Sequence, residues 1–105
     1  MSYNKLVRDN IPDIIKSNGE EPIIRILSDD EYKLELEKKL LEECNEVIES
    51  SGKNRIEELA DLLEVMISLS NLEESNLDEI INVCGEKRLK RGAFKKKIYL
   101  EKVNK

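Results

Sequence analysis

The sequence contains no histidine and no tryptophan, and it has only two cysteines, two prolines, four glycines, three tyrosines and one phenylalanine. Without histidine, the chain cannot form a Ser-His-Asp triad, a His-assisted cysteine nucleophile or a His-ligated zinc site. The two cysteines, Cys44 and Cys84, fall in helical patterns rather than in a spaced framework, so we expect reduced thiols in the core. Chemistry in this chain must therefore use carboxylates, lysines, arginines or hydroxyls.

Long apolar runs are also absent. No stretch approaches the roughly 18 residues of a membrane span, and residues 1–5 lack the apolar core of a signal peptide. We therefore expect a soluble, cytoplasmic protein. Its 105 residues fit a single domain, 1–105.

The charge is unevenly distributed along the chain. Residues 87–105 hold nine of the 18 Lys and Arg residues and one acid, Glu101, for a net charge of +8. The first 86 residues carry the other nine basic residues and 22 acids, a net charge of −13. A general nucleic-acid binder usually presents a basic face, so we expect no nucleic-acid polymer as partner. The distribution is compatible with a metal site that faces a phosphate clamp.

The small size and narrow apolar stripes predict self-association. A chain of this length buries only about two-thirds of the surface that it exposes when unfolded. Because 39% of the residues are charged, little apolar surface is available within one copy. We expect a homo-oligomer, either a dimer or a tetramer.

Three capping patterns mark the starts of three main helices: Ser28-x-x-Glu31, Asn54-x-x-Glu57 and Asn76-x-x-Glu79. Together with breaks at 51–52, at 71–75 and at Gly92, they predict helices over about 29–50, 54–73 and 76–91. A shorter helix is predicted from near Pro12 to Asn18-Gly19. The fold class is therefore all-α.

Two further segments have an extended, β-branched or alternating character. They are residues 22–27 (Pro-Ile-Ile-Arg-Ile-Leu) and residues 98–103 (Ile-Tyr-Leu-Glu-Lys-Val). We expect them to pair as a small two-stranded sheet beside the helices.

The apolar stripes of the first two main helices contain acids. On the first helix, one side is predicted to hold Tyr32, Leu36, Leu40, Glu43 and Val47, broadened by Leu41, Cys44 and Ile48. On the second helix, one stripe comprises Leu59, Leu63, Met66 and Ser70, and another comprises Leu62, Val65, Leu69 and Leu72 beside Glu58 and Asp61. We expect the second helix to be largely buried.

Two acid pairs with the same spacing lie on these faces: Glu43-x-x-Glu46 and Glu58-x-x-Asp61. If the helices form an antiparallel hairpin around residues 51–53, the pairs oppose one another near its turn. Buried carboxylates repel one another unless a cation binds, and all-oxygen ligands favour Mg²⁺ or Mn²⁺. Such ions bind phosphate oxygens and lower the pKa of water. Since exposed acid pairs are common, a metal site and a solvated acidic face stand as equal alternatives.

Several basic residues are candidates for contacts with a phosphate. Lys39 lies along the acidic face and either contacts a phosphate or pairs with Glu35, Glu43 or Glu46 on its own helix. Lys87 and Arg91, one turn apart at the end of the third main helix, are candidates for a phosphate clamp. Part of that cluster is explained by compensation of the helix dipole. Residues 95–97, three lysines, are more typical of a solvated run.

Residues 39–46 (Lys-Leu-Leu-Glu-Glu-Cys-Asn-Glu) followed by residues 58–61 (Glu-Leu-Ala-Asp) resemble the E-E-x-x-E and E-x-x-D signature of MazG-like nucleoside triphosphate pyrophosphohydrolases. Residues 3–12 (Tyr-Asn-Lys-Leu-Val-Arg-Asp-Asn-Ile-Pro) and 87–94 (Lys-Arg-Leu-Lys-Arg-Gly-Ala-Phe) are similar to a small single-domain branch of that superfamily, related to phosphoribosyl-ATP pyrophosphohydrolase. The resemblance covers nearly the whole chain.

The resemblance implies Mg²⁺-dependent hydrolysis between the α- and β-phosphates of a nucleotide, which yields a monophosphate and pyrophosphate, in a housecleaning role. It implies that Glu43, Glu46, Glu58 and Asp61 are metal ligands and catalytic residues, with Glu42 as an accessory acid. It also implies a homodimer or homotetramer whose helices complete a four-helix bundle across the interface. Arg8 belongs to the similar N-terminal segment and either closes over the substrate or anchors the first helix. Phosphoribosyl-ATP hydrolysis and a non-catalytic helical binding module are the alternatives.

Overall fold

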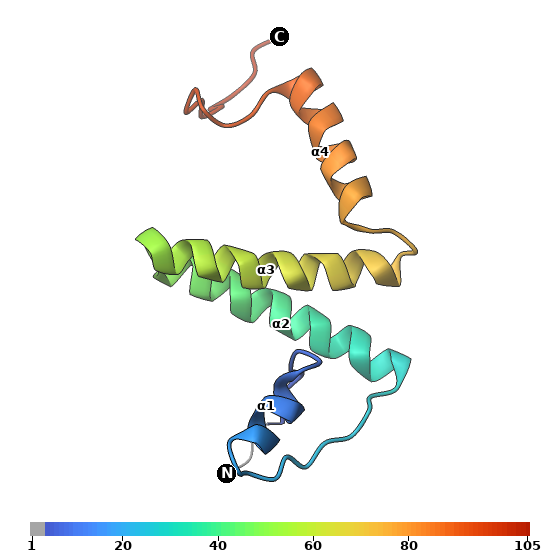
Figure 1. Cartoon of the computed structure of the whole chain (residues 1–105). Helices are drawn as coiled ribbons and strands as arrows, with labels where there is room; N and C mark the ends of the chain where they lie inside the picture. The colour runs from blue at the N-terminus through green and yellow to red at the C-terminus, as the bar shows by residue number, and fades with distance from the viewer. Residues whose placement is uncertain (1–3) are drawn as a thin grey trace.

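Four helices make up the fold of residues 4–105, the part of the chain that the computed structural model describes. They are α1 (Ile11–Ser17), α2 (Asp29–Glu49), α3 (Gly52–Leu72) and α4 (Leu77–Arg91), and the described residues contain no strand (Figure 1). Tyr3 of the N-terminal motif lies outside the described residues. The predicted all-α class is confirmed.

Side-chain caps fix the starts of α2 and α4 where the sequence predicts them. The Ser28 hydroxyl accepts from the Glu31 amide at 3.3 Å, and the Glu31 carboxylate accepts from the Ser28 amide at 3.2 Å, which completes a capping box. At α4, the Asn76 side chain accepts from the Glu79 amide at 3.0 Å. The prediction that Asn54 caps the next helix is wrong, because the N-cap of α3 is Ser51. α3 already begins at Gly52, where a φ of 59° turns the chain straight out of α2.

The α2–α3 hairpin is the packed part of the molecule, and its two helices run antiparallel (Figure 1). Leu36 on α2 and Val65 on α3 are buried, with 3% and 6% of their surface exposed. The predicted inner stripe of α2 is confirmed, because Leu36 and Glu43 are both buried there. Leu41 and Ile48, expected to broaden this stripe, instead lie exposed on the other side of α2.

The expectation that α3 is largely buried is wrong for a single copy. Val65 is its only buried residue, and Leu59, Leu63 and Met66 remain exposed. The physical reason is that one partner helix, α2, covers only one side of α3. The expected core position of Cys84 is wrong for a similar reason, since α4 meets only the end of α3 and leaves this free thiol exposed.

The expected two-stranded sheet does not form. Residues 22–27 and 98–103 are extended, and no backbone hydrogen bond joins them in the described chain. They lie at opposite ends of the molecule, because α4 carries the C-terminal residues away from the hairpin (Figure 1). Gly92 ends α4 with a φ of 81°, a conformation that favours glycine, and donates its amide to the carbonyl of Arg88 at 2.8 Å.

A single copy is extended and exposes much of its surface. Its radius of gyration is 18.3 Å, whereas a compact domain of 100 residues measures about 13 Å. It exposes 9955 Å², whereas a compact monomer of its mass exposes about 6,000 Å². None of the helices in residues 4–105 combines the length and the apolar character needed to cross a membrane.

Candidate metal centre

Three acids from α2 and α3 converge between the helices. One carboxylate oxygen from each of Glu43, Glu58 and Asp61 lies within 4.8 Å of the other two. The antiparallel hairpin explains this meeting, because its turn at residues 50–51 places position 43 of α2 opposite position 58 of α3. Asp61 follows Glu58 by three residues and therefore lies on the same side of α3. The prediction that the two acid pairs face one another is confirmed for Glu43, Glu58 and Asp61.

Two of these carboxylates have oxygen atoms that are buried without a partner. Glu43 has only 9% of its surface exposed, and its Oε2 atom has no hydrogen-bond partner. The Oε2 atom of Glu58 is likewise buried and has no hydrogen-bond partner. An unpaired buried carboxylate is costly, because it has lost its water without gaining a counter-charge or a donor. Lys39 Nζ lies 3.6 Å from Glu43 Oε1, so it compensates only the other oxygen of that residue.

Glu46, the fourth predicted ligand, is exposed and is not part of this three-residue cluster. Its carboxyl group nevertheless acts on Glu58. The pKa of Glu58 is raised above its ordinary value, first by a side-chain hydrogen bond with Glu46 and then by desolvation. The negative charges of Glu46, Asp61 and Glu43 raise this pKa further. The site therefore concentrates negative charge more densely than the described side chains neutralise.

The N-terminal segment reaches the same site. Arg8 Nη2 donates to Asp61 Oδ1 at 2.7 Å, and Arg8 Nη1 lies 4.0 Å from Glu64 Oε1. Arg8 therefore ties the N-terminal segment to α3, a contact that fits both roles weighed for it, closure over the site and anchoring of the first helix. Sequence reasoning missed Glu64, although its position one turn after Asp61 was the available signal.

A pocket of about 370 Å³ lies between this N-terminal segment and the hairpin. Its wall includes basic side chains and two acids of the cluster: Lys5, Arg8, Lys39, Glu43 and Asp61. Apolar side chains, among them Leu36 and Val65, line much of the rest, together with Asp9, Glu64 and Ser68. This volume lies within the range of small-molecule sites, about 300–1,000 Å³.

The other candidate residues lie outside the three-carboxylate cluster. Lys39 pairs with Glu43 along its own helix, one of the two roles considered for it. Glu42 is exposed on α2, outside the cluster. Lys87 and Arg91 lie on α4, which points away from the hairpin, and neither lines the pocket (Figure 1). A single copy therefore does not bring these two residues to the carboxylates.

The donor set of the cluster fits a hard divalent cation. Three carboxylates supply oxygen ligands, and no histidine competes for a softer metal. The two buried oxygens without partners are the atoms that a cation would satisfy. The residues present therefore fit Mg²⁺ or Mn²⁺.

Comparison with known proteins identifies a partial relative. An uncharacterized protein of Mycolicibacterium smegmatis is 54% identical over 43 residues, which are 41% of this chain and 44% of that protein. The match thus spans less than half the length of the relative. No family model matches the chain, and no solved structure matches it.

Proposed function

We propose that this protein is a MazG-like, Mg²⁺-dependent nucleoside triphosphate pyrophosphohydrolase that removes surplus or non-standard nucleotides from the cytoplasm. The observation that carries the proposal is the convergence of Glu43, Glu58 and Asp61 around buried carboxylate oxygens without partners. A protein that used this face only for solvation would have no reason to bury such oxygens.

Glu43, Glu58 and Asp61 would hold Mg²⁺, with Glu46 beside them through its contact with Glu58. When bound, Mg²⁺ supplies positive charge that stabilises developing charge on phosphate oxygens and lowers the pKa of water. In the reaction, water adds to a phosphorus atom and the bond between the α- and β-phosphates breaks, giving monophosphate, pyrophosphate and a proton. A carboxylate of the cluster accepts that proton.

Arg8 and Lys39 supply positive charge at the wall of the adjoining pocket. Each already contacts one acid of the cluster, Arg8 at Asp61 and Lys39 at Glu43. From these positions both side chains are suited to contact the phosphate oxygens of a nucleotide as well. Lys87 and Arg91 of α4 join this phosphate clamp only if a second copy or a movement of α4 brings them close.

Self-association into a four-helix bundle is part of the proposal. Leu34, Leu41 and Ile48 recur every seven residues on the outer side of α2, and each is at least 59% exposed. Leu59, Leu63 and Met66 form a second exposed stripe on α3. Two hairpins that bury these stripes against each other would form a homodimer, and further pairing would form a homotetramer.

The test is to incubate the protein and Mg²⁺ with a panel of ribo- and deoxyribonucleoside triphosphates and phosphoribosyl-ATP, and to resolve the products by ³¹P NMR. We expect the corresponding monophosphate and pyrophosphate. Glu43→Gln and Asp61→Asn should reduce turnover by more than the roughly 10–100-fold typical of losing an outer-shell partner of a metal site.

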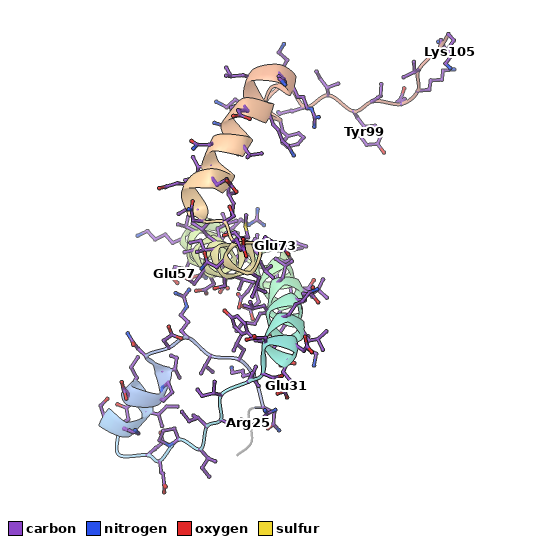
Figure 2. The ribbon with its side chains drawn as sticks, turned by 90° about the vertical axis from the view of Figure 1, so that its right-hand side faces the viewer. Arg25, Glu31, Glu57, Glu73, Tyr99 and Lys105 are labelled. Atoms are coloured by element: carbon purple, nitrogen blue, oxygen red, sulfur yellow. The ribbon has the colours of Figure 1, made fainter. Side chains whose placement is uncertain are left out.

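The matched control is Glu57→Gln, which removes an exposed acid of α3 next to Glu58 in sequence (Figure 2). It should retain full turnover. Orthophosphate as the only product would contradict cleavage between the α- and β-phosphates. No product from any nucleotide would favour a non-catalytic binding module, and product from phosphoribosyl-ATP alone would favour the narrower enzyme.

A further inference from the structure

Two extended segments of the chain have no strand partner among the described residues, although both are rich in apolar residues. In the loop segment, residues 22–27, Ile23 is 96% and Ile26 is 89% exposed. In the arm segment, residues 98–103, Ile98 is 80% and Tyr99 is 88% exposed. No backbone hydrogen bond of the described chain links either segment to another element. Exposed extended backbone with apolar side chains is a template for pairing with another chain.

The two segments have matching side-chain patterns. Successive residues of an extended chain point to opposite faces, so Ile24 and Ile26 share one face of the loop segment. Ile98 and Leu100 share one face of the arm segment in the same way, with Lys102 at the end of that face. The opposite face of each segment carries one charge, Arg25 in the loop and Glu101 in the arm. A pairing that joins the two apolar faces therefore also places opposite charges on one side.

The flanking charges favour an antiparallel arrangement. The loop segment follows Glu20 and Glu21 and precedes residues 29–31, three acids. The arm segment follows residues 95–97, three lysines, and is itself followed by Lys105. With Ile26 opposite Ile98 and Ile24 opposite Leu100, Lys95 lies opposite Asp29, the first of the three acids, and Lys105 lies near Glu20. A pairing of two arms would instead bring lysines together.

The geometry of one copy separates the two segments. In Figure 2, Tyr99 and Lys105 lie on an arm that extends from the far end of α4, whereas Arg25 lies at the other end of the molecule beside Glu31. Arg25 Nη2 donates to Glu31 Oε2 at 2.9 Å, which ties the loop segment to the start of α2. The molecule measures 64 Å in its longest direction. Its exposed area exceeds that of a compact monomer by more than the roughly 1,600 Å² that a standard interface buries.

We propose that the arm segment, residues 98–103, of one copy pairs antiparallel with the loop segment, residues 22–27, of a second copy. The exchange packs the apolar side chains on one face of both segments together and pairs the backbone groups along the facing edge of each. It also anchors the connection between α1 and α2, and α1 directly follows the N-terminal segment that lines the pocket. The partner that this surface fits is thus another copy of the same chain.

Cross-linking between two differently sized copies tests the exchange. In a Cys44→Ser, Cys84→Ser background, one copy carries Ile24→Cys and a larger tagged copy carries Leu100→Cys. After mixing and mild oxidation, we expect a disulfide-linked species with the summed mass of one tagged and one untagged chain. The pairing places these two positions opposite each other, within the range of Cα separations that a disulfide spans.

The matched control is Leu89→Cys, which places a thiol at an equally exposed apolar position of α4 outside the arm. It should give little cross-link with Ile24→Cys. An efficient Leu100→Cys homodimer would overturn the proposal, as would a disulfide within a single chain that carries both Ile24→Cys and Leu100→Cys. Equal cross-linking by Leu89→Cys would overturn it as well.

Hydrogen exchange on the unmodified chain gives a second readout. Alternate amides within residues 23–27 and 98–103 should exchange at least about tenfold more slowly as protein concentration rises through the range of self-association. Leu100→Asp should remove the protection of residues 22–27, although the substitution lies in the arm. Unprotected amides in both segments at all concentrations would contradict the exchange. Neither measurement uses nucleotide or metal, so their outcomes are independent of the hydrolase assay.

Discussion

Glu43 and Glu58 are the residues whose placement most clearly departs from what stability requires. Both have a carboxylate oxygen that is buried without a hydrogen-bond partner, although Lys39 lies 3.6 Å from the other oxygen of Glu43. A chain selected for stability alone would carry glutamine or an apolar residue at such positions. Buried carboxylates without partners are typical of a site that binds a ligand.

The first prediction concerns Glu58→Gln in the metal-free protein. At pH 8 this substitution removes one of several mutually repelling carboxylates, so the melting temperature should rise by a few degrees. The same variant should lose the stabilisation that Mg²⁺ gives to the wild type. Thermal denaturation with and without Mg²⁺ measures both effects. A lower melting temperature without metal would show that Glu58 is a structural residue.

The acid spacing made three residues of the site predictable from the sequence. Two pairs three residues apart, on helices joined by a short turn, place Glu43, Glu58 and Asp61 together. The contact between Arg8 and Asp61 was not predictable in the same way, because 53 residues separate them and no helical period links them. Only the N-terminal resemblance pointed toward Arg8.

At the level of elements, local hydrogen bonds explain where α2 and α4 begin. The capping box at Ser28 includes Glu31, whose pKa is lowered to about 2, first by its hydrogen bond with Arg25 and then by hydrogen bonds with Ser28. Because the pKa is lower in the folded state, Glu31 stabilises the fold above its ordinary pKa near 4.5. That stabilisation is lost as the pH falls toward 2.

The second prediction follows from this linkage. Glu31→Gln should lower the melting temperature at pH 6, and the difference from wild type should vanish as the pH approaches 2. Ser28→Ala should lower the free energy of unfolding by about 1 kcal/mol at pH 6, the usual effect of losing an N-cap. Urea and thermal denaturation across pH 2–6 measure these changes. A pH-independent difference for Glu31→Gln would contradict the role of its charge.

Two predictions about the elements are wrong: the start of α3 and the two-stranded sheet. Asn54 has the pattern of an N-cap, yet the turn at Gly52 starts α3 two residues earlier. Residues 22–27 and 98–103 have strand character, but α4 holds them apart within one copy. Strand formation depends on a partner, which an alternating pattern alone does not provide.

At the scale of the whole molecule, a single copy leaves much apolar surface exposed. Leu36 and Val65 are the buried apolar residues of the described chain, while both helices of the hairpin keep exposed apolar stripes. Such patches usually mark an interaction surface.

The third prediction is therefore the mass in solution. Light scattering at micromolar concentration should give at least twice the chain mass of 12.2 kDa. Leu41→Lys, which places a charge in the exposed stripe of α2, should shift the equilibrium toward monomer. Lys33→Glu, an exposed change that does not lie three or four residues from Leu34, Leu41 or Ile48, is the control and should leave the mass unchanged. A monomeric wild type would contradict the proposed four-helix bundle between two copies.

The measurement that tests the central claim most directly is a Mn²⁺ titration followed by electron paramagnetic resonance. The wild type should bind Mn²⁺ and release it when Mg²⁺ is added in excess. Glu43→Gln and Asp61→Asn should weaken binding by at least about tenfold, and Glu57→Gln should bind as the wild type does. Equal binding by all four proteins, or no binding by the wild type, would contradict a metal centre between α2 and α3.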